Sequence, residues 1–271
     1  RTLLAAMRER LDEAPVERVA DRNPPLLPPA DGLNVIRALR LAQPMTRAAY
    51  VKEIDRWQGR LAALSRDRRF ARTAVVAVFE GNDAAGKGGA IRRVTGSLDA
   101  RLYQGVSVAA PTEEERAQPY LWRFWRHLPR RGRFVIFDRS WYGRVLVERV
   151  EGFCREPDWM RAYGEINDFE KQLADSGVVV AKFWLAIDAD EQLQRFKARE
   201  ETAFKRFKIT AEDWRNREKW DAYELAVCDM IDRTSTPVAP WTLVEANNKY
   251  HARIKVLRTL VKAVEDAFDA M

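Results

Sequence analysis

We predict an α/β fold with three layers, in which a five-stranded parallel sheet lies between two layers of helices. Continuous apolar, β-prone runs alternate with helical patterns along the chain, as in a parallel sheet covered on both faces. A glycine-rich loop follows the first run and opens the next helical pattern. A long polar helical stretch separates the last two runs. These observations predict one sheet, a ligand-binding loop at its edge and a helical insertion beside it.

Five apolar runs predict the strands. They cover residues 74–79, 106–110, 134–137, 178–187 and 241–244. Helical patterns lie at residues 90–98, 113–127 and 158–174, and a longer one lies between 188 and 232. Because the apolar runs are continuous rather than alternating, we expect strands that are buried on both faces. Ligands of such sheets bind beyond the carboxyl ends of the strands, and we expect the functional site there.

The chain is predicted to have an N-terminal arm and one main domain. Residues 1–45 form the arm or linker, because a charged helical pattern at the start gives way to four prolines between residues 24 and 29. Residues 46–271 form the domain, with a helical lid at about 188–235. Its first helix is expected to begin after Thr46, a candidate N-cap.

A phosphate-binding loop is predicted between the first strand and the helix that follows it. The loop consists of Gly81, Asn82, Asp83, Ala84, Ala85, Gly86, Lys87 and Gly88. It matches G-x-x-x-x-G-K, in which backbone N–H groups form an anion nest and Lys87 adds a charge on the phosphoryl group. Gly88 stands where Ser or Thr usually supplies a hydroxyl to magnesium, so Asp83 is the nearest replacement ligand. The alternative is a glycine-rich turn without a ligand.

An acidic residue ends the third predicted strand, in the Walker B arrangement. Asp138 can hold Mg²⁺, or Mn²⁺ in its place, against phosphates, and Asp83 would provide a second carboxylate. Arg139 would point into the same crevice and stabilise charge on a transferring phosphoryl group. For Asp138 the alternative is a helix-cap or turn role.

Aromatic and charged residues follow this strand and are candidates for the acceptor side. They are Trp141, Tyr142, Arg144, Glu148 and Arg149. Each could contact a base, a ribose or an acceptor phosphate. Core packing of Trp141 and surface pairing of Arg149 are the alternatives that the sequence leaves open.

The chain is basic, with 47 Lys and Arg against 40 Asp and Glu and a formal charge of +7. This balance suits a polyanion such as nucleic acid, an anionic membrane or a phosphate polymer. Two clusters contain Arg123, Arg126, His127, Arg130, Arg131 and Arg133, and Arg195, Lys197, Arg199, Lys205, Arg206 and Lys208. Arg92 and Arg93 on the helix after the loop extend the positive surface. An ordinary nucleotide needs fewer cations, which favours a longer polyanion; a solvated surface is the alternative.

The cysteine, histidine and apolar content of the chain restrict the compartment, the metal sites and the membrane topology that we expect. The two cysteines, Cys154 and Cys228, are far apart, which predicts no disulfide framework and a reducing, cytoplasmic setting. With only His127 and His251, a histidine-rich metal site is implausible. No apolar run is long enough to cross a membrane. The chain begins with Arg1 rather than Met, which suggests a trimmed chain or a segment of a longer polypeptide.

At these motifs the chain resembles the polyphosphate kinase type 2 family. The matching segments are 79–89, 110–112, 137–142, 147–153, 195–199 and 239–241. The resemblance runs from about Tyr50 to the C-terminus. The resemblance is specific, because Gly88, Asp83 in the loop and the sequence Asp-Arg-Ser-Trp-Tyr at 138–142 occur together. It implies a P-loop kinase fold with a helical lid, and magnesium-dependent phosphoryl transfer between inorganic polyphosphate and nucleotides.

The resemblance also implies roles for individual residues. Asp83 and Asp138 look like the magnesium and reaction-centre carboxylates, and Arg144 and Glu148 look like acceptor-side groups. Phosphate-binding cations are implied at Lys87, Arg139, Arg195 and Arg199. From the basic clusters we add Arg92, Arg93, Arg123, Arg126 and Lys208 as polyphosphate ligands. Gly143 departs from the pattern, since many relatives carry Asn there, and this leaves the acceptor contacts open.

Segments 143–148 and 207–214 look most like the branch of the family that phosphorylates AMP, in which two such modules are fused. We therefore expect a polyphosphate:AMP phosphotransferase that forms ADP, either as a homo-oligomer or as the second module of a fused protein. One alternative is a family member that uses ADP or GDP, or that makes polyphosphate from nucleoside triphosphates. The others are an ATP-dependent nucleoside-phosphate kinase and a P-loop nucleic-acid-binding module. The loop carboxylate and the lid disfavour the last of these.

Overall fold

A computed structural model describes residues 34–271 together with residues 5, 7, 8 and 12, apart from the side chains of residues 204, 205 and 208. Five parallel strands form one sheet in the order β2-β3-β1-β4-β5. The strands are β1 (Ala74–Gly81), β2 (Tyr103–Ser107), β3 (Arg133–Asp138), β4 (Val178–Ala186) and β5 (Trp241–Glu245). The predicted five-stranded parallel sheet is confirmed.

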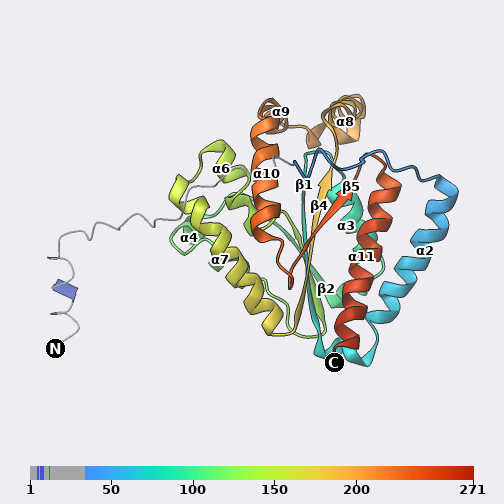
Figure 1. The fold of residues 1–271 in the computed structure, drawn as a ribbon, viewed down its shortest axis with the longest axis horizontal. Helices are drawn as coiled ribbons and strands as arrows, with labels where there is room; N and C mark the ends of the chain where they lie inside the picture. The colour runs from blue at the N-terminus through green and yellow to red at the C-terminus, as the bar shows by residue number, and fades with distance from the viewer. Residues whose placement is uncertain (1–4, 6, 9–11, 13–33) are drawn as a thin grey trace.

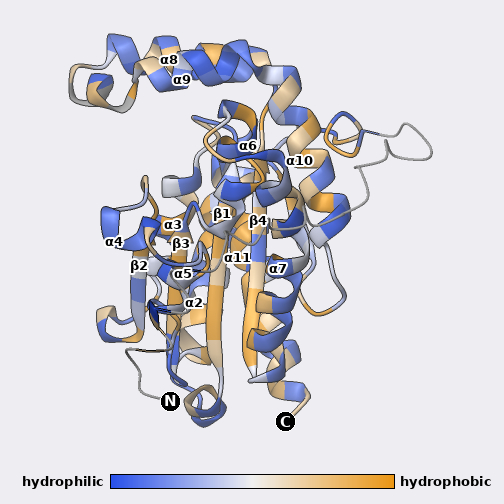
Figure 2. Cartoon of the chain, turned by 90° about the vertical axis from the view of Figure 1, so that its left-hand side faces the viewer, coloured by the Kyte–Doolittle hydropathy of each residue, from blue (hydrophilic) through white to orange (hydrophobic). Residues whose placement is uncertain are grey.

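Helices cover both faces of this sheet (Figure 1). One layer contains α2 (Arg47–Leu64), α3 (Lys87–Thr95) and α11 (Lys249–Asp269). The other contains α7 (Glu156–Asp175) and α10 (Trp220–Thr234). Phe79 and Phe183 pack toward the first layer, whereas Val78 and Phe137 pack toward the second. Strands β1, β3 and β4 are hydrophobic along much of their length (Figure 2), and the three-layer prediction is confirmed.

The central strand β1 positions the phosphate-binding loop. It pairs with β3 on one side and β4 on the other, with Ala74 opposite both Arg133 and Val178. Every residue of β1 except Gly81 is buried. Because all five strands are parallel, their carboxyl ends meet at one edge of the sheet. At this catalytic edge the loop follows β1, and Asp138 ends the adjacent strand.

The second strand differs from its prediction. It covers Tyr103–Ser107 rather than 106–110, and its side chains are exposed or half-buried. It is an edge strand that pairs only with β3, so its start is set by backbone pairing and not by an apolar run. The prediction of a fully buried strand is wrong at this position.

The predicted helix at 113–127 is also wrong as a single element. The structure has two short helices, α4 (Glu113–Arg116) and α5 (Trp122–Trp125). Pro119 lies between them and cannot donate a helical hydrogen bond. A capping box formed by Thr112 and Glu115 begins the first helix.

A helical insertion separates β4 from β5, as predicted. It contains α8 (Ala189–Glu201), the 3₁₀ turn η4 (Ala203–Lys208), α9 (Ala211–Glu218) and α10. Helices α8 and α9 lie above the catalytic edge, at the top of Figure 1. The insertion is therefore placed to cover the loop that follows β1.

The N-terminal segment that the structure describes runs along the catalytic edge to α2 (Figure 1). Asn34 donates a hydrogen bond to Glu224 of α10 at 2.8 Å, and Arg37 forms an ion pair with the same carboxylate at 2.6 Å. Most of the predicted arm, residues 1–45, lies outside the described residues. Within the described part of the chain, no helix has the length and apolar content needed to span a bilayer.

Candidate active site

The loop from Gly81 to Lys87 has the backbone geometry of an anion nest. Gly81, Ala84 and Gly86 have φ angles of 149°, 63° and 107°. A Cβ atom on Gly81 would lie 2.4 Å from the carbonyl oxygen of Leu185, so β4 leaves no room for a side chain there. The ammonium group of Lys87 donates to the Gly81 carbonyl oxygen at 2.7 Å. The predicted loop is formed, and Lys87 lies across it.

Arg195 of α8 supports this loop from its outer side. Its guanidinium group donates to the carbonyl oxygens of Ala84 and Ala85 at 2.9 and 3.0 Å, and to those of Ala246 and Asn247 at 2.7 and 3.0 Å. Its Nε donates to Glu191 at 2.6 Å, and the residue is only 6% exposed. Burial lowers the pKa of Arg195, while Glu191 partly offsets this effect. The predicted phosphate ligand is thus tied to the backbone of the loop and of the segment after β5.

Asp83 connects the loop to the helical insertion. The side-chain amide of Asn216 in α9 donates to its carboxylate at 2.9 Å, and Arg139 approaches the other oxygen to 3.6 Å. The side chain of Gln192 in α8 donates to the Asp83 carbonyl oxygen at 3.2 Å. Both α8 and α9 therefore contact Asp83, and α8 also contacts the loop through Arg195.

The end of β3 brings the second predicted carboxylate to the same edge. Asp138 lies opposite Phe79 in the register of β1 and β3. Its carboxylate has no ion pair or side-chain hydrogen bond with any residue that the structure describes. Arg139 has a left-handed φ of 64°, and its N–H donates to the Phe79 carbonyl oxygen at 3.0 Å. This turn directs Arg139 toward Asp83.

A third carboxyl group, Glu80, was not singled out from the sequence. It is the last residue of β1 before the loop, is only 6% exposed, and accepts a hydrogen bond from Ser140 at 2.8 Å. Burial raises its pKa, and Ser140, Lys87 and Arg139 offset part of that rise. The available signal was an acidic residue at the end of an otherwise apolar run.

Two carboxylates are available for a divalent metal ion at this edge. Asp83 and Asp138 come from the loop and from β3, as predicted. Among the residues that the structure describes, no cluster of three His, Cys, Asp or Glu side chains could hold a metal by itself. Mg²⁺ commonly binds one or two carboxylates and takes its other ligands from water and substrate phosphates. The site fits such an ion when a phosphate substrate is present.

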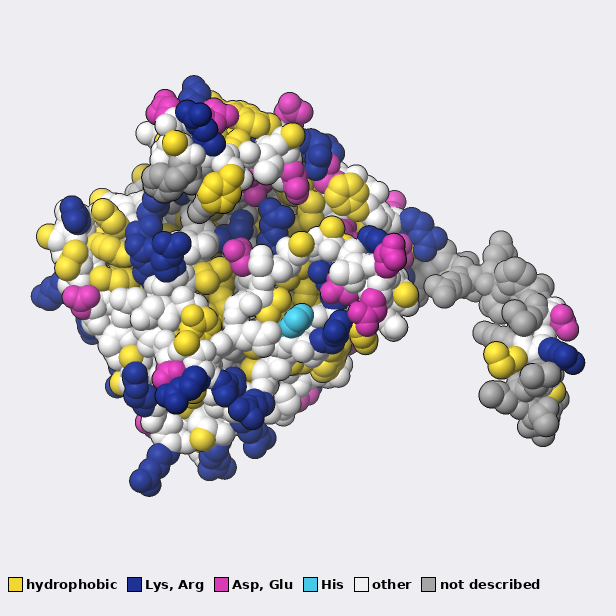
Figure 3. Space-filling view, turned by 180° about the vertical axis from the view of Figure 1, so that it is seen from behind, with side chains coloured by type: hydrophobic (Ala, Val, Ile, Leu, Met, Phe, Trp, Pro, Cys, Tyr) yellow, Lys and Arg dark blue, Asp and Glu magenta, His cyan; other side chains and the backbone are white. Residues whose placement is uncertain are grey.

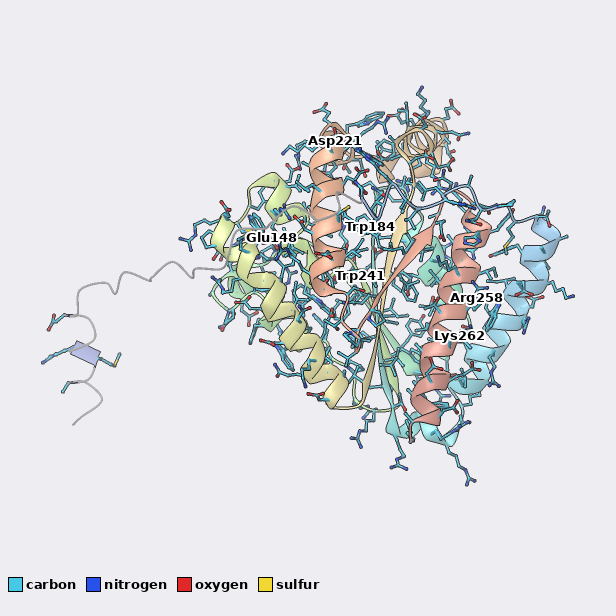
Figure 4. The ribbon with its side chains drawn as sticks, in the orientation of Figure 1. Glu148, Trp184, Asp221, Trp241, Arg258 and Lys262 are labelled. Atoms are coloured by element: carbon cyan, nitrogen blue, oxygen red, sulfur yellow. The ribbon has the colours of Figure 1, made fainter. Side chains whose placement is uncertain are left out.

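A pocket lies on the inner side of the loop, between β1, β3 and the insertion. Its empty space is about 710 Å³ when open solvent is included. Its lining includes Glu80, Asp83, Lys87, Arg139, Gly143, Leu146, Val147, Trp184, Gln192, Glu212, Asn216, Trp220 and Tyr223. Trp184 lies on the α10 side of the sheet (Figure 4). We refer to this cavity as the inner pocket.

A second cavity lies on the outer side of the same loop. Its lining includes Ala84, Ala85, Gly86, Glu191, Arg195, Arg199, Lys249, Ala252 and Arg253. Burial lowers the pKa of Lys249, and the nearby Arg195, Arg253 and Arg199 lower it further, whereas Glu191 raises it. We refer to this cavity as the outer groove. Its cations repel one another, which is an arrangement that an anion would stabilise.

Lys249 and Arg253 are functional candidates that sequence reasoning missed. Both lie in the first two turns of α11 and form no ion pair with a described residue. A further cavity, lined by residues 42–45 and 247–250, shares Glu191, Lys249 and Arg253 with the outer groove. The available sequence signal was a basic pattern after Asn248.

The predicted acceptor-side residues lie near the inner pocket but pair with one another. Arg144 forms an ion pair with Glu148 at 2.8 Å and stacks over the ring of Tyr120. At this side the pocket is lined by Gly143, Leu146 and Val147. The 3₁₀ turn η3 (Trp141–Arg144) and helix α6 (Val147–Glu151) carry these residues.

Trp141 and Arg149, two further candidates for the acceptor side, contact other side chains of the protein and do not line the inner pocket. Trp141 is fully buried and donates to Glu170 at 3.1 Å. Arg149 pairs with Asp229 at 2.7 Å and donates to the hydroxyl of Tyr163. The alternatives that the sequence left open, packing for Trp141 and pairing for Arg149, describe both residues.

The remaining predicted polyphosphate ligands are spread over the molecule. In α5, Arg123 pairs with Glu115 at 3.2 Å, and Arg126, directly after this helix, stacks over Trp122. On α3, Arg92 is exposed, whereas Arg93 donates to the hydroxyl of Tyr50 at 3.3 Å. The side chain of Lys208 lies outside the described residues. Of the described residues among them, Arg92, Arg93, Arg123 and Arg126 line neither the inner pocket nor the outer groove.

The three-layer fold and the loop at the end of its central strand define a protein of the P-loop kinase class. A family model described as polyphosphate kinase 2 matches residues 44–270, and the chain belongs to this family. It is 64% identical over 244 residues to a polyphosphate:AMP phosphotransferase of Pseudomonas aeruginosa, covering 90% of this chain and 49% of that relative. The chain spans about half the length of this relative and of a polyphosphate:AMP phosphotransferase of Pseudomonas syringae.

Solved structures agree with this assignment. A Pseudomonas aeruginosa crystal structure that carries the polyphosphate kinase 2 name superposes with a TM-score of 0.85 and 65% identity, over 86% of this chain and 51% of that one. Polyphosphate kinase 2 from Arthrobacter aurescens superposes with a TM-score of 0.82 and 31% identity, over 91% and 90% of the two chains. The predicted family and P-loop kinase fold are confirmed.

Proposed function

We propose that the protein transfers the terminal phosphoryl group of inorganic polyphosphate to AMP, forming ADP. The observation that carries this proposal is the position of the phosphate-binding loop between two different cavities. The inner pocket has carboxylate, amide and aromatic groups, whereas the outer groove is basic. A phosphoryl-transfer enzyme needs such a donor site and acceptor site on either side of the transferred group. The printed names of the relatives support polyphosphate as donor and AMP as acceptor.

The donor chain is assigned to the outer groove. Its terminal phosphoryl group would occupy the nest of Gly81 to Gly88, and the preceding phosphates would lie against Arg199, Lys249 and Arg253. Arg195 would act through the loop, because its donors already bind four carbonyl oxygens. The groove adjoins a second open cavity through Lys249 and Arg253, which extends the space open to the donor chain.

AMP is assigned to the inner pocket, with its phosphate toward Asp83 and Arg139 and its base toward Trp184, Trp220 and Tyr223. A phosphate oxygen of AMP attacks the terminal phosphorus of the donor chain. The bridging P–O bond breaks, and a polyphosphate shorter by one unit leaves. Lys87 and Arg139 stabilise the charge on the transferred group, and no covalent enzyme intermediate is required.

Asp83 and Asp138 would hold magnesium, which supplies charge neutralisation on the phosphates when bound. The hydrogen bond from Asn216 to Asp83 would help to hold the insertion over the loop and to keep water from the transferred group. We further propose that the chain is one module of a longer protein, since the polyphosphate:AMP phosphotransferase relatives are about twice as long. A cytoplasmic location and a homo-oligomeric state remain predictions.

Two substitutions test the proposed roles. Lys87→Ala removes the cation that crosses the loop, and Asp138→Asn removes the unpaired carboxylate. We expect each to abolish nearly all turnover, with unchanged circular dichroism and a thermal midpoint close to that of the parent protein. Lys52→Ala, on the exposed side of α2, is the control and should retain full turnover. Unfolding of either variant, or full activity in a folded one, would remove these assignments.

A further inference from the structure

Arginine side chains gather at the edge of the sheet opposite the catalytic edge. They come from the segments that lead into three adjacent strands, β1, β3 and β2. The set consists of Arg66, Arg68, Arg69, Arg72, Arg101, Arg130, Arg131 and Arg133. Because the strands are parallel, their amino ends also meet at one edge. We call this set the basal arginine surface, and dark-blue side chains gather at the lower end of the molecule in Figure 3.

Direct contacts hold these segments together. The N–H of Gly132 donates to the Thr73 carbonyl oxygen at 2.7 Å, which joins the turn before β3 to the start of β1. The rings of Phe70 and Phe134 stack with centroids 4.7 Å apart. Asp99, before β2, has its pKa lowered first by Arg101 and also by Arg66. The arginines therefore lie on one continuous surface and not on separate loops.

The positive charge of this surface is only partly compensated. The segments 66–73, 99–101 and 130–133 contain eight arginines and two aspartates. Asp67 pairs with Arg69 and Asp99 pairs with Arg101. Exposed side chains without an ion pair or hydrogen bond to a described residue are Arg68, Arg72, Arg130 and Arg131. Unpaired guanidinium groups on a common edge favour an anionic partner with several charges.

The chemistry of the surface favours a phosphate chain over a nucleic acid. All eight cations are arginines, whose planar donor fork matches phosphate oxygens in pairs. Phe70 lies in these segments and Phe134 directly follows Arg133; the two rings are buried against each other, so they offer no platform on which bases could stack. β1 contains eight residues and spans roughly 26 Å, which separates this surface from the loop. Helix α3 begins at the loop, and the exposed Arg92 lies in its last turn. Along the chain, Arg92 therefore lies between the loop and Arg101.

We propose that the basal arginine surface binds a distal stretch of the same long polyphosphate chain whose end occupies the loop. This inference takes its ligand from the proposed function. Contact at two places on one molecule raises the apparent affinity for long chains without changing the chemistry at the loop. A short oligophosphate cannot reach both places and gains nothing. The surface would therefore make the protein prefer long donors.

The test compares two triple variants with the same loss of charge. Arg68→Gln, Arg72→Gln and Arg131→Gln remove unpaired cations from the surface. The control changes Lys52, Arg258 and Lys262 to Gln; these residues are exposed on α2 and α11, and Figure 4 shows the two α11 residues. For long-chain polyphosphate we expect the basal variant to raise KM about tenfold with kcat unchanged. For a short oligophosphate its KM should not change. The control should match the parent protein with both donors.

Binding is measured separately from turnover. Labelled long-chain polyphosphate is titrated into the Lys87→Ala protein with and without the basal substitutions, so the comparison holds even if the protein proves not to use polyphosphate as a donor. Affinity that drops about tenfold only in the basal variant supports the proposal. Equal losses in the basal and control variants, or equal losses for long and short chains, would overturn it. The proposal would also be overturned if the basal variant lost binding to single-stranded DNA but kept its affinity for polyphosphate. In that case the surface would be a nucleic-acid-binding site.

Discussion

At the scale of single residues, Gly81 shows how closely the loop is fitted to the sheet. Its φ of 149° lies in a region that L side chains rarely adopt, and the Leu185 carbonyl oxygen blocks the position of a Cβ atom. A glycine here allows the chain to leave β1 and turn at once around a phosphate. The identity of this residue is therefore required both by backbone conformation and by packing.

We predict that Gly81→Ala lowers the free energy of unfolding by roughly 2–4 kcal/mol and reduces turnover, because β4 or the loop must move. Chemical denaturation provides the measurement. Gly59→Ala is the matched control: Gly59 lies on the exposed side of α2 with open space around it, and alanine should stabilise that helix by about 0.5–1 kcal/mol. Equal effects of the two substitutions would contradict this account of the loop.

Glu80 gives a prediction about pH. Burial raises its pKa above the usual value of 4.5, so between that value and the raised pKa the folded protein binds more protons than the unfolded chain. The stability contribution of this group is then fully present below 4.5 and is lost as pH rises through the raised pKa. Glu80→Gln removes that loss and can still accept the hydrogen bond of Ser140. Thermal midpoints measured across pH should coincide at acidic pH, with the variant more stable at alkaline pH; the opposite order would contradict the assignment.

At the scale of elements, α8 both covers and supports the phosphate-binding loop. Arg195 and Arg199 lie one turn apart on this helix, and the sequence assigned both to phosphate. In the structure the donors of Arg195 bind backbone carbonyl oxygens from the loop and from the segment after β5, whereas Arg199 lines the outer groove. One residue supports the loop, and the other lies on the path proposed for the donor chain.

The two residues should therefore respond differently to the same conservative change. Arg195→Lys cannot reproduce the forked contacts, and we expect it to lose about 3 kcal/mol of stability and much of kcat. Arg199→Lys keeps the charge, and we expect an unchanged thermal midpoint with KM for polyphosphate raised roughly fivefold. Denaturation and steady-state kinetics on both proteins provide the comparison. A stable Arg195→Lys protein with normal kcat would show that the loop does not depend on this contact.

The elements that could be predicted from the sequence are those with strong local signals. The apolar runs of β1, β3, β4 and β5 and the glycine-rich loop could be found because burial and backbone conformation restrict their residue types. The start of β2 depends on pairing with β3, which leaves little trace in an exposed edge strand. The support role of Arg195 depends on Ala246 and Asn247, about fifty residues away in the chain, so no local pattern predicted it.

At the scale of the whole molecule, the fold separates three regions of charge. The inner pocket is lined by the carboxylates of Glu80, Asp83 and Glu212 together with Lys87 and Arg139. The outer groove is lined mainly by cations on the other side of the loop, and the basal arginine surface lies at the opposite edge of the sheet. The parallel sheet produces this separation, because it gathers all carboxyl ends at one edge and all amino ends at the other. A long polyanion and a small acceptor can then bind without competing for the same side chains.

The most direct test of the central claim is a product assay with purified protein, long-chain polyphosphate, AMP and magnesium, in the absence of ATP. The account predicts that ADP accumulates while the polyphosphate chain shortens, and that the Lys87→Ala protein forms none. Parallel reactions contain ADP or GDP as acceptor, or ATP with AMP in place of polyphosphate. Transfer only to ADP or GDP would contradict the assignment of AMP to the inner pocket. Transfer only from ATP, or no transfer at all, would contradict the assignment of polyphosphate to the outer groove.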